Sequence, residues 1–374
     1  MKPTIIEVKT RKELRRFVHY PNEMYKDNPY YVPTLEKGDR DALDPKKNHA
    51  FEFCEGTYWL ALDDNGRIVG RIAGIINQMY NRKSGINGAR FGFMDFIDDD
   101  EVVDALFDTV ENWARKKGMK RIIGPQGFLE FDASGVLVEG FDQLPTAYGK
   151  YNFPYYDAQL VRRGYGKDTD WVEMRITLPD QVDTLFERPA RIIAERLHLR
   201  QAEIRDKKEM AAWFDKCVVV LNQAYSKLHG FTELSPGQVE DLKKQFVPNL
   251  NPDFVSIIID EQDEVVGFGI SLPSLSRALQ KCRGRLFPLG FLHILHALKH
   301  NDTLDSLLIG IRNGYKNQGI HAMIFNKLSK TATRMGIKYI ESTRQLEDNL
   351  NVQNLWNRFD HTLTKRARCY VKNL

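Results

Sequence analysis

The sequence contains few cysteines, and none of them is in a paired pattern. There are four, with no C-x-x-C spacing among them: Cys54, Cys217, Cys282 and Cys369. Neither a disulfide framework nor a zinc site follows from such scattered positions, and no bound metal is expected. Unpaired thiols are typical of a reducing compartment, so we expect a cytoplasmic protein.

Long apolar segments are also missing. The N-terminal stretch MKPTIIEVKTRKELRR has no hydrophobic region of the kind that a signal peptide requires. The longest apolar run, 286–298, is shorter than the roughly 20 residues of a membrane-spanning helix. We therefore expect a soluble protein without a transmembrane segment. An ordinary buried helix is the simplest interpretation of this run. With basic residues on both sides, the run also fits an acyl tunnel or contact with a membrane surface.

Neither sign of charge is in excess. The 54 basic and 50 acidic residues are interspersed and leave a net charge of +4. This balance argues against a nucleic-acid partner. The only feature that favours such a partner is the basic cluster Lys365-Arg366-Ala367-Arg368. It is compatible with an anionic ligand.

The chain is too long for one compact core. Domains cluster near roughly 100–150 residues, so a chain of 374 residues predicts two or three of them. With 42% hydrophobic and 28% charged residues, the composition is that of packed domains and argues against extended disorder.

The first half of the chain alternates between strand-like and helix-like segments. The turn Asp63-Asp64-Asn65-Gly66 joins the arms of a hairpin, and Asp98 to Glu101 can cap the helix that follows them. The expected strands are 4–8, 58–62, 68–76, 89–96, 121–123 and 171–176, and the expected helices are 11–25, 102–117 and 154–163.

The second half repeats this order of elements with little identity of sequence. Its expected strands are 254–259, 265–271, 306–311, 338–342 and 367–371, and its expected helices are 208–225, 238–245, 321–335 and 351–359. Strands and helices that alternate after an antiparallel hairpin predict a mixed α/β sheet. We therefore predict two tandem domains, 1–178 and 201–374, joined by a linker at 179–200.

One turn in the second half has the character of a phosphate site. The apolar strand 307–311 runs into a polar turn that carries Lys316 and Gly319, and a helix follows. The free N–H groups and partial positive charge of a helix N-terminus favour phosphate, and glycine lets it approach the backbone closely. The same pattern also fits an ordinary tight turn, and on these residues alone both interpretations stay open.

This turn resembles the pyrophosphate loop of the GNAT superfamily of acyl-CoA N-acyltransferases, with its pattern Arg/Gln-x-x-Gly-x-Gly/Ala. Lys316, Gly319 and His321 occupy the three specified positions, and Asn349 and Trp356 stand where the family has an asparagine and a tyrosine. Weaker similarity to a subgroup of long bacterial GNAT-like proteins extends over nearly the whole chain. The resemblance implies acetyl-CoA or a longer acyl-CoA as cosubstrate, held by Ile311, Arg312, Lys316, Asn317, Gln318, Gly319, Ile320 and His321.

Departures from the family pattern bear on catalysis. The family's tyrosine commonly protonates the departing thiolate, whereas the indole of Trp356 is a hydrogen-bond donor and not a practical acid. Asp360 stands where a glycine is expected. In the first half, the carboxylates of 98–101 occupy the place of the phosphate turn and would repel pyrophosphate, so we interpret that domain as degenerate.

The candidate catalytic residues are Glu341 and Asn349. Glu341 is expected at the end of a strand beside the cofactor strand, where a carboxylate can take a proton from an amine; a solvated or salt-bridged glutamate is an equal alternative. A backbone N–H of Ile311, Arg312 or Asn313 would polarise the thioester carbonyl. His321 fits a phosphate contact or a base, but a capping role is the more ordinary one.

Two functions remain open on this reading. The first is an acyl-CoA-dependent N-acyltransferase that acts on a small amine or an amino-acid-like acceptor. The second is a catalytically silent protein that binds acyl-CoA as a signal, which the replacements at Trp356 and His321 favour.

Overall fold

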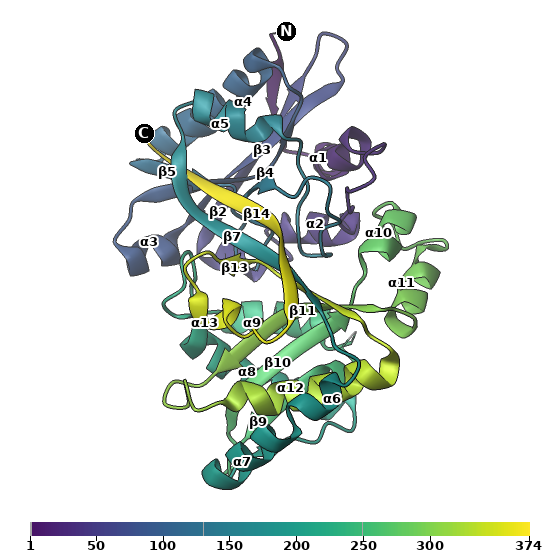
Figure 1. Cartoon of the computed structure of the whole chain (residues 1–374). Helices are drawn as coiled ribbons and strands as arrows, with labels where there is room; N and C mark the ends of the chain where they lie inside the picture. The colour runs from purple at the N-terminus through teal and green to yellow at the C-terminus, as the bar shows by residue number, and fades with distance from the viewer. Residues whose placement is uncertain (1, 130, 249) are drawn as a thin grey trace.

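The computed structural model describes residues 2–129, 131–248 and 250–374 and contains one continuous sheet with helices on both faces (Figure 1). The first half contains β1 (Thr4–Glu7), α1 (Arg11–Met24), α2 (Glu36–Ala42), a 3-10 helix (His49–Glu52), β2 (Cys54–Leu62), β3 (Ile68–Asn77), α3 (Gln78–Ser84), β4 (Gly88–Phe96), α4 (Asp100–Lys116), β5 (Arg121–Gly124), β6 (Val136–Glu139), α5 (Tyr155–Arg162) and β7 (Gly166–Thr177).

The second half repeats this alternation of strands and helices. It contains α6 (Val182–Leu185), α7 (Glu187–Leu197), β8 (Arg200–Gln201), α8 (Lys207–Tyr225), α9 (Pro236–Phe246), a 3-10 helix (Pro252–Phe254), β9 (Val255–Ile259), β10 (Val265–Pro273), α10 (Ser276–Cys282), α11 (Gly290–Lys299), β11 (Thr303–Ile311), α12 (Ile320–Met335), β12 (Tyr339–Ser342), β13 (Gln345–Leu346), α13 (Leu350–Gln353) and β14 (Asp360–Asn373).

The sheet joins the two halves through the last strand of the chain. Its order is β1-β2-β3-β4-β5-β14-β7-β12-β11-β10-β9-β8, so β14 lies between β5 and β7 of the first half. Figure 1 shows β7 and β14 running side by side from one half of the molecule to the other. Among the described residues, only β4–β5 and β11–β12 pair in parallel. The sheet is therefore mixed, as the sequence predicts.

Alternating side chains bury strands β2, β9 and β10 on both faces. In β2, Trp59 and Ala61 pack with α4, whereas Tyr58 and Leu60 pack on the opposite face with Phe17 of α1. The second half follows the same rule: β9 and β10 contact α8 on one face and α12 on the other. This period of two is what an extended backbone imposes on a strand buried between helices.

Local signals fix several helix starts. Thr10 and Glu13 form a capping box at α1, and Ser235 and Gln238 form another at α9. Asp99 accepts hydrogen bonds from the N–H groups of Glu101 and Val102 at α4. The acidic run in the first half thus satisfies its own helix N-terminus and leaves no room there for a phosphate.

The tandem GNAT-like order of elements is confirmed, but some details differ. The helix expected at 351–359 is the single turn α13, and the strand expected at 367–371 is the much longer β14. The segment expected as a linker, 179–200, folds into α6 and α7, which pack against α12. The domain bounds 1–178 and 201–374 remain a prediction.

The apolar run 286–298 is not the buried helix that was the simplest expectation. Its helix, α11, has no buried residue, and several of its large apolar side chains are exposed. The reason is its position: α11 packs mainly on α10, outside the helices that cover the sheet (Figure 1). Within the described residues, no helix has the length and apolarity needed to cross a membrane.

Candidate functional site

The turn before α12 adopts a backbone that exposes the helix N-terminus. Gly319 is the N-cap residue with φ of +87°, and Asn317 also has a positive φ, of 62°. No side chain caps this helix, because glycine has none to offer. Its first N–H groups therefore point out of the helix without a side-chain acceptor, in the manner of a phosphate-binding turn.

Helix α7 and a hydrogen bond within the turn itself hold the backbone of this turn in place. Arg196 of α7 donates to the carbonyl oxygen of Gln318 at 3.0 Å, and the side chain of Gln318 donates to the carbonyl of Gly314 at 2.7 Å. A Cβ added to Gly319 would lie 2.6 Å from Cδ1 of Ile193. Helix α7 thus contacts the turn on one side, and the positive φ together with this contact favours glycine at its centre.

The charge around the turn is positive. Lys316 is exposed and makes no ion pair with any described residue. Arg358 lies close enough to His321 to lower its pKa, although burial is the larger cause of that shift. His321 is therefore a neutral imidazole near pH 7, able to donate to or accept from a ligand but not to attract one by charge.

Arg312 has other partners. Its backbone N–H donates to the carbonyl of Val266 at 2.8 Å, and its guanidinium pairs with Glu264 at 3.3 Å. The N–H of Arg312 is therefore not free to polarise a thioester, and that expected role does not fit the geometry. Ile311 is the last residue of β11 and pairs with Gly267.

Strand β11 continues well beyond the end of its parallel neighbour β12. Their parallel register runs from Thr303 opposite Tyr339 to Ser306 opposite Ser342 and then ends. Beyond that point Thr343 turns away, and its side chain donates to the carbonyl oxygens of Ser306 and Leu307 at 2.9 and 3.2 Å. Within the part of the chain that the structure describes, the rest of β11, up to Ile311, has no strand on this side, which leaves a wedge open in the sheet.

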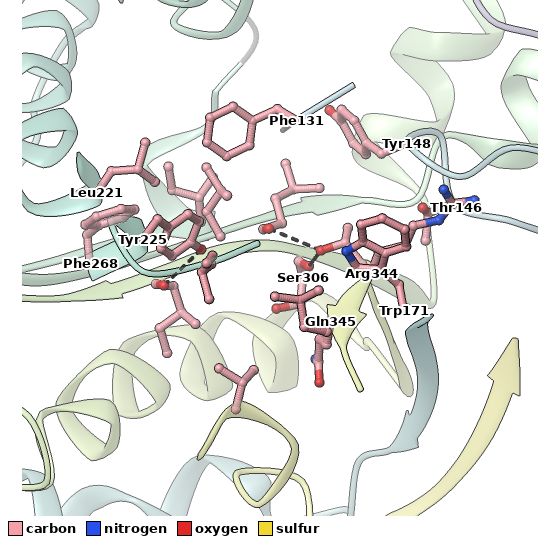
Figure 2. A pocket seen from close by; sticks show the side chains of 18 of the residues that line it. Phe131, Thr146, Tyr148, Trp171, Leu221, Tyr225, Phe268, Ser306, Arg344 and Gln345 are labelled. Atoms are coloured by element: carbon pink, nitrogen blue, oxygen red, sulfur yellow. Dashed lines mark hydrogen bonds between the residues drawn. The ribbon is translucent and has the colours of Figure 1, made fainter. Parts of the chain in front are cut away.

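An apolar cavity of about 270 Å³ lies at this wedge. Figure 2 shows Leu221 and Tyr225 of α8 and Phe268 of β10 on one side of it, and Trp171 and Arg344 on the other. The hydroxyl of Tyr225 donates to the carbonyl of Ile309 at 3.1 Å, so its one polar atom is satisfied and its ring faces the cavity. The lining suits an aliphatic chain.

A buried charged cluster closes the polar side of the cavity. Glu173 of β7 accepts from Nε of Arg344 at 3.3 Å and pairs with Nζ of Lys365 at 3.1 Å. All three are largely buried, and burial lowers the pKa of Arg344. The indole N–H of Trp356, also buried at this cavity, has no hydrogen-bond partner among the described residues. An unsatisfied donor in an apolar wall is costly, so it is suited to a ligand atom.

The two candidate catalytic residues lie in adjoining cavities. Asn349 lines the apolar one, whereas Glu341 lines a polar cavity of about 530 Å³; Thr146 borders both. Glu341 accepts from Arg175 at 2.9 Å. Burial raises the pKa of Glu341 against the opposing charges of Lys365 and Arg175. A carboxylate so placed takes up a proton more readily than an exposed glutamate does, as a general base must.

Asp305, beside Glu341 in the β11–β12 register, is fully buried. Burial, with smaller contributions from Glu341 and Glu173, raises its pKa to about 7. No sequence pattern pointed to Asp305, Glu173 or Arg344, and Lys365 stood out only as part of the basic cluster 365–368. A signal for Glu173 exists in hindsight: it is a carboxylate within the otherwise apolar run Trp171-Val172-Glu173-Met174.

The phosphate turn and the apolar cavity are linked through one aromatic row. The ring of His321 lies 6.3 Å from that of Phe325, which lies 5.8 Å from Trp356 at the cavity wall.

The basic run 365–368 faces acidic partners instead of solvent: Lys365 pairs with Glu173, and Arg368 donates to Asp170 at 2.9 Å.

A split parallel strand pair, a helix that opens on a positive-φ glycine, and the duplicated order of elements define the tandem GNAT fold. Comparison with solved structures agrees. A tandem GNAT protein from the clavulanic acid biosynthesis pathway superposes with a TM-score of 0.56 at 10% identity, covering 99% of this chain and 98% of that one. A GCN5-related N-acetyltransferase from Sphaerobacter thermophilus gives 0.52 at 10% identity, covering 99% and 95%. The resemblance is thereby confirmed at the level of fold.

Two curated bacterial proteins are similar in sequence along nearly their whole length. The chain is 28% identical to Protein YghO of Escherichia coli (strain K12) over 375 residues, 97% of this chain and 94% of that protein. It is 27% identical to the bacterial ceramide synthase of Caulobacter vibrioides over 380 residues, 99% and 97% of the two chains. No protein-family model matches the chain.

Proposed function

We propose that the protein transfers the acyl group of an acyl-CoA to an amine, and that a long aliphatic chain of one substrate occupies the apolar cavity. The observation that carries this proposal is the cavity itself. It opens at the wedge between β11 and β12, and residues of α8 and β10 form its apolar wall. The exposed N-terminus of α12, with Gly319 and Lys316, would hold the pyrophosphate.

The chemistry needs a base and a route for the leaving group. The amine nitrogen attacks the thioester carbonyl, a C–N bond forms, the C–S bond breaks, and coenzyme A leaves as a thiol. Glu341 would take the proton from the amine, because burial has raised its pKa. The indole N–H of Trp356 would donate a hydrogen bond to the departing sulfur, which then takes its proton from water or from another group.

The acceptor follows from the same lining. The sequence suggests a small amine or an amino-acid-like acceptor, but such a molecule would leave apolar walls such as Leu221 and Phe268 in contact with water. A long-chain amine, or a long acyl group, would fill them. The relative named a ceramide synthase points the same way, since a ceramide is an amide of a long-chain amine and a fatty acid.

A silent acyl-CoA-binding protein is the second candidate function. The observation that favours it is Trp356, which cannot act as the acid that the family's tyrosine supplies. Binding and turnover separate the two candidates, because a silent protein binds acyl-CoA and releases no coenzyme A.

The test is release of free thiol from acetyl-CoA and from palmitoyl-CoA with three acceptors: glycine, ethanolamine and sphinganine. Amide products are identified by mass spectrometry. We expect thiol release to need sphinganine and palmitoyl-CoA together. Glu341→Gln should lower kcat by about tenfold or more and remove the fall in activity at low pH. Glu195→Gln, an exposed glutamate on α7, serves as the matched control.

Each other outcome contradicts part of the proposal. If acyl-CoA binds but no acceptor releases thiol, the silent protein is correct. If glycine or ethanolamine with acetyl-CoA is preferred, the acceptor is small and the apolar cavity has another occupant. If Glu341→Gln retains the rate and pH profile of the unsubstituted protein, the base is a different group.

A further inference from the structure

The loop before α11 and the outer side of that helix form an exposed apolar surface, which we call the α11 surface. It consists of Phe287, Leu289, Phe291, Leu292 and Leu295. Phe287 is 80% exposed and Leu289 64% exposed, values that a large apolar side chain seldom has in a folded protein. Phe287 and Phe291 pack ring to ring at 6.0 Å, so the surface is contiguous at its tip. A contiguous apolar surface of this kind marks an interaction site.

The helix that carries this surface is polar on its other side. His293, His296 and His300, at spacings of three and four residues, line the polar cavity that also contains Glu341. Side chains three and four apart share one face of a helix, so α11 separates the polar cavity from its apolar outer side. Figure 1 shows α10 and α11 standing out from the body of the second half.

Basic residues flank the α11 surface along the chain, and one of them, Lys281, also lines the polar cavity. Lys281, Arg283 and Lys299 are exposed and make no ion pair with any residue that the structure describes. Arg285 is paired with Glu36 at 3.5 Å, and Glu36 is already shared with His19. The rim is therefore left with uncompensated positive charge, whereas the protein as a whole is nearly balanced at +4.

We propose that the α11 surface docks the protein on an anionic phospholipid bilayer. Apolar side chains at the tip would enter the acyl region, while Lys281, Arg283 and Lys299 meet the phosphates of the headgroups. Helix α11 has 10 residues, too few to span a bilayer, so it would lie in the interface. The unpaired positive rim favours this occupant over a second copy of the chain, whose identical rim would repel it.

The docking stands apart from the acyl-transfer proposal. It depends only on the α11 surface and can be measured with bare vesicles and no acyl-CoA. If acyl transfer fails but vesicle binding persists, the docking proposal holds; the reverse result rejects docking alone. Where both hold, α11 would lie between the bilayer and the polar cavity that contains Glu341.

The test is sedimentation with vesicles of phosphatidylcholine alone and with about 30% phosphatidylglycerol added. We expect binding to the anionic vesicles, weakened by salt. The variant Phe287→Ser/Leu292→Ser should bind about tenfold more weakly or worse, because it removes two inserted side chains. The matched control is Val161→Ser/Val219→Ser, which removes exposed apolar side chains of 57% and 56% exposure elsewhere. It should bind as the unsubstituted protein does.

A charge variant, Lys281→Gln/Lys299→Gln, should weaken binding to anionic vesicles only. Equal binding by both serine double variants would overturn the proposal, as would absence of binding to either vesicle. Light scattering tests whether a second copy of the chain covers the α11 surface instead. A dimer that dissociates in the variant Phe287→Ser/Leu292→Ser would show that this surface joins two copies, and the bilayer proposal would be overturned. Circular dichroism of each variant establishes that the fold is retained.

Discussion

Replacing Gly319 by alanine tests the phosphate turn most directly. Gly319 has φ of +87°, and an alanine Cβ there would lie 2.6 Å from Cδ1 of Ile193. Both the backbone and the neighbouring α7 must adjust. Since this residue is the N-cap of α12, the adjustment moves the N–H groups that would bind pyrophosphate.

The size of the effect can be estimated in two parts. A non-glycine residue in the left-handed region costs roughly 1–2 kcal/mol of stability. A hydrogen bond to a charged phosphate contributes about 1.5–3 kcal/mol, so one misaligned N–H raises the Kd of an acyl-CoA roughly 10- to 100-fold. Stability and affinity should therefore both fall in Gly319→Ala.

The matched control is Gly336→Ala at the other end of the same helix. Gly336 has φ of +69°, and no atom lies within 4 Å of its added Cβ. It should lose a similar amount of stability in urea unfolding, but its Kd in isothermal titration with acetyl-CoA should stay within about twofold. Equal Kd values for Gly319→Ala and Gly336→Ala would refute the assignment of the turn, as would no binding of acetyl-CoA by the unsubstituted protein.

Three further substitutions probe the cavity and its charged wall. Leu221→Trp should fill the apolar cavity and lower kcat/KM for palmitoyl-CoA at least about tenfold while urea unfolding changes by no more than about 3 kcal/mol; unchanged chain-length preference would contradict the proposed occupant. Asp305→Asn tests a raised pKa of about 7. The protonated form of Asp305 stabilises the fold below about pH 4, and this contribution is lost as the pH rises towards 7. The free energy of unfolding of the unsubstituted protein should therefore fall by about 4 kcal/mol relative to that of the variant between these pH values. If the free energies of unfolding in urea change in parallel with pH for both proteins, the raised pKa is refuted. Trp356→Phe should leave stability within about 1 kcal/mol, because its N–H has no partner among the described residues, yet lower kcat about tenfold; an unaffected kcat would exclude the donor role.

Much of the fold could be predicted because its strands and helices carry strong local signals. The hairpin turn at Asp63–Gly66, the cap at Asp99 and the C-terminal glycine Gly336 each fix an element boundary through backbone chemistry that neighbouring residues determine. The strand–glycine–helix turn at Gly319 was found for the same reason. The residues that form this turn are consecutive in the sequence, so it could be predicted without any distant partner.

Features that depend on distant partners could not be predicted. The insertion of β14 between β5 and β7 pairs residues far apart in the chain, and no local pattern encodes it. The exposure of α11 has the same origin: its run is as apolar as that of a buried helix, but no element among the described residues covers its outer side. Likewise, Glu173, Arg344 and Lys365 come from three separate strands or loops, and only the assembled sheet brings them together.

The position of β14 has a consequence for how the molecule is made. Its residues come much later in the chain than β5 and β7, between which they complete the sheet; the thiol of Cys369 donates a hydrogen bond to the carbonyl of Gly124, 245 positions before it. Until β14 pairs with them, those two strands present open edges that invite pairing with other chains. The sheet of the first half is therefore complete only when β14, which belongs to the second half, has paired with β5 and β7. Residues 1–178 expressed alone are expected to aggregate, and to become soluble when a peptide of residues 360–374 is supplied in trans.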